Sequence, residues 1–93
     1  MNIVLLIGKF KKISQTNNEK LPFKLTISVR REWKELDGNY KEDEFDVYVS
    51  EWWRNIEDVV KDKLEKECFI SFKCHLGYIE KEMVLVLENI TCM

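Results

Sequence analysis

The stretch ISVRREWKELDGNYKEDEFDVYV, residues 27–49, places two runs of alternating apolar and polar residues around a highly charged loop. Alternation of this kind predicts strands that are buried on one face only. The Asp-Gly-Asn segment at 37–39 is the strongest turn signal in the chain. The stretch therefore predicts a long hairpin with a mobile charged tip, and two arginines and a tryptophan stand where that tip begins.

The flanking sequence predicts the remaining elements. Strands are expected at 2–10, at 23–30 as the first arm of the hairpin, at 68–75, and at 83–87 reaching towards Ile90. After Ser50 as a helix N-cap, apolar residues at helical spacing predict a helix over 51–67 with a buried stripe of Trp52, Ile56, Val59, Val60 and Leu64. Five short strands with one helix between the third and fourth predict an all-β chain and an OB-fold, a five-stranded Greek-key barrel. The 93 residues are enough for one domain, over 1–93.

The net charge of −2 conceals two halves of opposite sign. Residues 1–34 hold eight basic and two acidic residues, a net charge of +6, and residues 35–93 hold seven basic and fifteen acidic residues, a net charge of −8. Because polyanions respond to local fields, a basic first third remains compatible with a nucleic-acid partner despite the acidic total.

The composition argues against several other classes of protein. No apolar run approaches the length of a membrane span, and the five apolar residues at 3–7 lack the flanks of a signal peptide. Cys68, Cys74 and Cys92 form no metal-ligand spacing with His75, so we expect reduced thiols in a cytoplasmic protein, with no metal and no disulfide. His75 has no catalytic partner in the sequence pattern, so no enzyme, cofactor or small-molecule substrate is predicted.

Several segments resemble the bacterial single-stranded-DNA-binding (SSB) family. MNIVLLIGKF at the start, FKLTISVRREW at 23–33, DGNYKEDEFDVYV at 37–49, the expected helix and LENI at 87–90 are similar to family features, and the similarity extends over nearly the whole chain. The resemblance implies an OB-fold that binds single-stranded DNA in replication, repair and recombination, and that assembles as a dimer or tetramer. Family members usually end in a long linker with an acidic tip, whereas this sequence stops at Met93, so we expect no partner recruitment by that route.

Carried over by position, the resemblance gives candidate DNA-binding residues. Trp33 and Phe45 match family aromatics that stack on bases, and the cations Lys9, Lys11, Lys12, Arg30, Arg31 and Lys34 match positions that follow the phosphate backbone. Tyr40, Tyr48, Lys24 and Lys73 complete the candidate set. An aromatic ring stacks on any base, and Lys and Arg neutralise phosphates, so this combination suits binding without sequence preference.

The sequence leaves some of these assignments open. Phe45 alternates with Val47 and Val49, which favours the core, while the resemblance makes it a stacking platform. Arg30 and Arg31 are adjacent, so in a regular strand they point to opposite faces and only one can face a ligand. The function predicted is sequence-independent binding of single-stranded DNA; the alternative is a protein–protein adaptor on the same fold with weak or no DNA binding.

Overall fold

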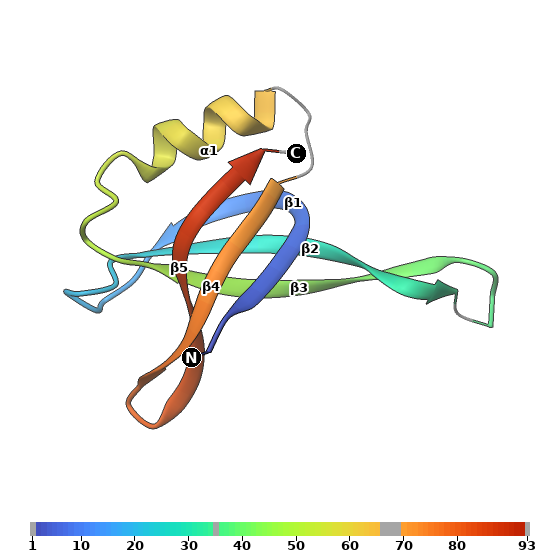
Figure 1. The fold of residues 1–93 in the computed structure, drawn as a ribbon, viewed down its shortest axis with the longest axis horizontal. Coiled ribbons are helices and arrows are strands. Elements are labelled where there is room, and N and C mark those ends of the chain that lie inside the picture. The colour runs from blue at the N-terminus through green and yellow to red at the C-terminus, as the bar shows by residue number, and fades with distance from the viewer. Residues whose placement is uncertain (1, 35, 66–69, 93) are drawn as a thin grey trace.

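The fold is a closed five-stranded barrel with one helix. In the computed structural model, which describes residues 2–34, 36–65 and 70–92, the elements are β1 (Val4–Gln15), β2 (Phe23–Lys34), β3 (Tyr40–Val49), α1 (Ile56–Glu65), β4 (Ile70–Ile79) and β5 (Glu82–Cys92). The strands close in the order β1-β2-β3-β5-β4 (Figure 1), with β3 and β5 parallel and the other pairs antiparallel. The predicted five-stranded barrel with a helix between its third and fourth strands is confirmed.

The first strand closes the barrel by changing partner at Gly8. Residues 4–8 pair with β4, and from Lys9 onward the strand pairs with β2. A Cβ atom on Gly8 would overlap the backbone carbonyl oxygen of Ser28 on β2. Because backbone in a sheet cannot move aside as the end of a side chain can, the crossing requires a residue without a side chain.

The core fills the barrel with the inward side chains of the alternating strands. Leu25, Ile27, Val47, Val49 and Phe72 are among its fully buried members. The helix α1 lies across one end of the barrel (Figure 1) and adds Ile56 and Val60, both fully buried. Cys74 on β4 is also in this core, and burial raises the pKa of its thiol to about 11.

The second and third strands extend beyond the barrel as the long hairpin predicted for residues 27–49. Figure 1 shows β2 and β3 continuing past the other strands, and their register runs from Phe23 opposite Val49 to Lys34 opposite Tyr40. At the tip Gly38 has a φ of 84°, and the side chain of Asp37 accepts a hydrogen bond from the Asn39 amide at 3.0 Å. The turn assigned to the Asp-Gly-Asn segment is confirmed.

The start of the helix was predicted wrongly. The chain makes tight turns over residues 51–55, where the Trp53 amide donates to the Ser50 carbonyl and the Ile56 amide donates to the Trp53 carbonyl, both at 3.0 Å. The helix then begins at Ile56, with the acidic Glu57 and Asp58 in its first turn, where they complement the helix dipole. As a result Trp53 packs against the core, and Trp52, predicted to be buried, is 88% exposed.

The last two strands form a tight hairpin. Glu80 and Lys81 connect β4 to β5 with φ values of 48° and 74°, the positive angles of the two-residue turns that suit a twisted hairpin. Near this hairpin the Asn2 side chain accepts from the Leu76 amide at 2.8 Å and donates to the Leu76 carbonyl at 3.4 Å, so it extends the pairing of β1 with β4. The predicted strand residues 68 and 69 and helix residues 66 and 67 lie outside the described residues.

We predict that Gly8→Ala lowers the free energy of unfolding by roughly 1–3 kcal/mol, because β1 or β2 must shift to admit the methyl group. Gly77→Ala is the matched control, since its Cβ would meet only the end of the Val86 side chain, at 3.3 Å. Urea unfolding of the three proteins measures the difference. Equal stability of the two variants would show that the crossing at Gly8 tolerates a side chain.

Candidate nucleic-acid interface

The outward side of β1, β2 and β3 brings many of the predicted residues together. Alternation puts Lys24, Thr26, Ser28 and Arg30 of β2 on the side opposite the core, and the register places Lys9 and Lys12 of β1 and Glu42, Glu44, Asp46 and Tyr48 of β3 beside them. We call these ten residues the outer sheet face. Lys11 lies next to the outer sheet face, at the point where the register of β1 and β2 shifts, and its side chain is exposed.

Two hydroxyl groups lie in the middle of the outer sheet face. Thr26 and Ser28 are each 4% exposed. Thr26 donates to the Asp46 carboxylate at 3.1 Å, and Ser28 donates to the Glu42 carboxylate at 2.9 Å. These bonds tie two exposed carboxylates of β3 to β2, above hydroxyl groups that are themselves almost fully covered.

Charge is divided across the outer sheet face. Lys9 and Lys12 are exposed on the β1 side, and Glu42, Glu44 and Asp46 are exposed on the β3 side. Lys24 is the cation that reaches across, with its Nζ atom 3.9 Å from the Asp46 carboxylate. A polyanion on this face is therefore attracted to the β1 side and repelled from the β3 side.

The two adjacent arginines have different partners, as their alternation predicted. Arg30 lies on the outer sheet face with its guanidinium carbon 4.7 Å from the centre of the Tyr40 ring. Arg31 makes two hydrogen bonds to the Asp43 carboxylate, at 3.0 and 2.9 Å, and Asp43 lies opposite Val29 on the core-facing alternation. The structure therefore brings Arg30 to the outer sheet face and uses Arg31 in an ion pair on the other side of the hairpin.

The predicted aromatics fall in separate places. Tyr40 is at the tip of the hairpin, with the Lys34 ammonium 5.6 Å from its ring centre, and Tyr48 is half-buried opposite Lys24. Phe45 lies opposite Ile27 on the core-facing alternation, yet it is 37% exposed. Trp33 belongs to β2, but its side chain lies outside the part of the structure that is described.

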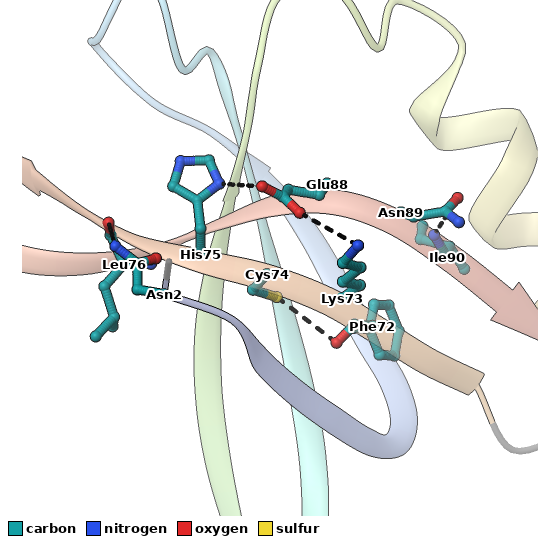
Figure 2. Close-up of polar contacts among 9 residues, drawn as sticks. All are labelled: Asn2, Phe72, Lys73, Cys74, His75, Leu76, Glu88, Asn89 and Ile90. Carbon is teal, nitrogen blue, oxygen red and sulfur yellow. Dashed lines mark hydrogen bonds and ion pairs between the residues drawn. The ribbon is translucent and has the colours of Figure 1, made fainter.

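Lys73 does not join the other cations. It lies on β4 opposite Leu5 of β1, and Figure 2 shows it with His75 on either side of Glu88. Its Nζ atom is 3.9 Å from one Glu88 carboxylate oxygen, and Nδ1 of His75 is 3.1 Å from the other. Lys73 is therefore part of a small charged cluster on the β4–β5 surface.

Sequence reasoning missed Trp52, the most exposed tryptophan among the described side chains. It follows β3 and lines an open hollow of about 270 Å³ with Glu51 and Arg54. The Glu51 amide donates to the Lys20 carbonyl at 3.1 Å, which ties this segment to the 16–22 loop. The pair of adjacent tryptophans was the available signal, because helical spacing to Ile56 and Val60 fits Trp53 as well as Trp52.

Among residues 2–34, 36–65 and 70–92, no group of three or more His, Cys, Asp or Glu side chains could hold a metal ion. In the same ranges no helix is long and apolar enough to cross a membrane. The outer sheet face itself combines four cations, three carboxylates, two hydroxyl groups and the ring of Tyr48.

Comparison with known proteins supports the fold. No protein-family model and no curated protein matches the sequence. Among solved structures, a small single-stranded DNA binding protein from Mycoplasma pneumoniae matches with a TM-score of 0.66 and 17% identity, over 98% of this chain and 85% of that one. The Plasmodium falciparum SSB in complex with single-stranded DNA matches with a TM-score of 0.58 and 15% identity, over 100% and 95%. The chain is an OB-fold.

Arg31 and Asp43 give a pH-dependent contribution to stability whose sign follows from the structure. The hydrogen bonds from Arg31 lower the pKa of Asp43 below its ordinary value of 3.8. A carboxyl whose pKa is lower in the folded state stabilises the fold above the unfolded-state pKa, and this contribution is lost as pH falls through the folded-state pKa. We predict that native protein loses more stability than Asp43→Asn between about pH 5 and pH 2, measured by urea unfolding at each pH. Parallel stability curves would show that the pair is not formed in solution.

Proposed function

We propose that this protein binds single-stranded DNA without reading its sequence, with the phosphate backbone on the β1 side of the outer sheet face. The observation that carries the proposal is that face itself, with Lys9 and Lys12 along one border and polar residues in its middle, together with the exposed Trp52 beyond the end of β3. The barrels it resembles include an SSB in complex with single-stranded DNA. A role alongside replication, repair or recombination follows from this activity.

The charge division of the face sets the path of the DNA chain. Phosphates next to Lys9 and Lys12 release counterions, while phosphates next to Glu44 and Asp46 meet like charge. Where β1 borders the face, the backbone is thus kept to the β1 side, and the bases extend over Thr26 and Ser28 towards β3. Stacking does not select one base over another, because every base has a ring face that can stack.

Aromatic and basic residues at the ends of the face complete the path. Trp52 supplies an exposed ring next to Arg54 at one end, and the Arg30, Lys34 and Tyr40 group lies at the other end, on the hairpin. Trp33 and Phe45 remain predictions as stacking residues. Arg31 and Lys73 lie off the path, so we assign neither of them a contact with DNA.

The test is a titration of the native protein with a thymidine oligonucleotide, followed by intrinsic tryptophan fluorescence and by the anisotropy of a labelled strand. We predict salt-sensitive quenching, and a loss of about 1–3 kcal/mol of binding free energy in Trp52→Ala, because one base loses its stacking partner. Lys9→Ala and Lys12→Ala should each make the slope of log K against log salt shallower by about 0.7.

Lys61→Ala is the matched control, since Lys61 is an exposed lysine on α1 and lies away from the outer sheet face. The slope of log K against log salt for Lys61→Ala should equal that of native protein. If native protein shows neither quenching nor anisotropy change at low salt, DNA binding is excluded as the main activity, and the adaptor interpretation replaces it.

We also propose that the chain self-associates through the outward side of β1. Ile3, Leu5 and Ile7 alternate there and are 47%, 63% and 50% exposed, so three large apolar side chains form one stripe. Contiguous exposed apolar surface of this kind marks interaction sites, and closed symmetric dimers are the commonest assembly. A second copy of the same stripe is the occupant that its apolar, self-complementary character fits.

We predict that sedimentation of the native protein gives a mass above the 11.2 kDa of one chain, and that Leu5→Glu brings it to the monomer value. Met83→Glu is the control, because Met83 is 60% exposed on the β4–β5 hairpin and lies outside the stripe. A native monomer at high concentration, or equal dissociation by both variants, would contradict self-association through β1.

A further inference from the structure

The tip of the β2–β3 hairpin holds two cations against one aromatic ring. The guanidinium carbon of Arg30 is 4.7 Å from the centre of the Tyr40 ring, and the ammonium nitrogen of Lys34 is 5.6 Å from it. Both distances lie within the roughly 6 Å at which a cation is attracted to the face of a ring. Tyr40 itself is 42% exposed, so the group stands at the surface.

A register shift in β2 produces this grouping. Arg30 lies opposite Glu42, and Lys34 lies opposite Tyr40, so four steps along β2 match two steps along β3. In a regular ladder the residue two positions after Arg30 would have faced Tyr40, and Lys34 would have lain beyond it. The irregularity draws Lys34 back beside the ring, while Arg30 reaches the same ring as its diagonal neighbour.

The nearest carboxylate in the register does not draw Arg30 away from the ring. Glu42 lies opposite Arg30, but its Oε2 atom accepts the hydrogen bond of Ser28 at 2.9 Å. Ser28 is almost fully buried, so this bond holds Glu42 towards the barrel end of the hairpin. A guanidinium stacked on a ring keeps its N–H donors pointing outward in its own plane, where a phosphate can accept from them.

We infer that Tyr40 is a positioning residue: its ring holds Arg30 and Lys34 as a pair of phosphate-binding cations, and it does not itself stack on a base. This inference rests on the proposed binding of single-stranded DNA and assigns the hairpin its role in it. A base could stack on Tyr40 only where a cation did not cover that part of the ring. The hairpin therefore contacts the backbone of the strand, and the stacking contacts lie elsewhere on the face.

The ring of Tyr40, and not its hydroxyl group, is the part that this role requires. Phenylalanine offers the same ring face to a cation, so Tyr40→Phe should bind a thymidine oligonucleotide within about twofold of native protein. Tyr40→Leu removes the ring, and we expect about a three- to tenfold loss of affinity. In the free protein, side-chain proton resonances of Arg30 and Lys34 should be shifted upfield by the ring in native and Tyr40→Phe protein, and should lose that shift in Tyr40→Leu.

A double-mutant cycle decides between positioning and stacking. If the ring acts through the two cations, Tyr40→Leu costs nothing further in a chain that already carries Arg30→Ala and Lys34→Ala. If the ring stacks on a base, the same substitution costs its full three- to tenfold in that background, and the inference is overturned. Absence of the upfield shifts from native protein would overturn it as well.

The outcomes for the proposed function and for this inference can be told apart. If native protein binds no oligonucleotide, both are removed. If native protein binds but Tyr40→Leu costs as much in the Arg30→Ala, Lys34→Ala chain as in native protein, only this inference is removed.

Discussion

The crossing of β1 over β2, where Gly8 meets the carbonyl of Ser28, is the constraint on which the rest of the structure depends. Because no side chain separates the strands there, one strand can pair with β4 through residue 8 and with β2 from residue 9 onward, and the barrel closes. The same crossing places Lys9 opposite Ser28, so the step that closes the barrel also delivers the first cation to the outer sheet face. Fold and candidate site thus share one contact.

Binding of a polyanion by an acidic protein becomes physically reasonable once the charges have positions. The carboxylates of β3 are not spread evenly; two of them are held by the hydroxyls of Thr26 and Ser28. They form the border of the outer sheet face that faces away from Lys9 and Lys12. On the proposed path the acidic residues of β3 would keep the phosphates of a bound strand on the β1 side, so the net charge of −2 is compatible with the proposed binding.

The presence and order of the strands were predictable from apolar runs and alternation, but their ends were not: β1 continues to Gln15, beyond the predicted residue 10, and β4 continues to Ile79, beyond the predicted residue 75. The turn at 37–39 was predictable because its residues are turn formers. The start of the helix was not, since Trp52 and Trp53 both fit the spacing to Ile56, and only the turns over 51–55 decide which of them is buried. Adjacent Arg30 and Arg31 could be assigned to opposite sides from sequence. Their partners, a tyrosine ring and the Asp43 carboxylate, depend on the pairing register of β2 with β3, which no local pattern signals. Lys73 was grouped with the other cations by its charge alone, and the pairing of β4 with β1 puts it beside Leu5.

The burial of Cys74 has a consequence for how this barrel can be followed in solution. Burial raises the pKa of its thiol to about 11, so at neutral pH the sulfur stays in the unreactive thiol form. The sulfur is enclosed by core side chains, and its contact with the Phe72 carbonyl, at 3.8 Å, stays within its own strand. In the closed barrel Cys74 is chemically silent. Its modification by an external reagent therefore requires β4 to part from its neighbours, so the reaction rate of this one thiol reflects how often the barrel opens.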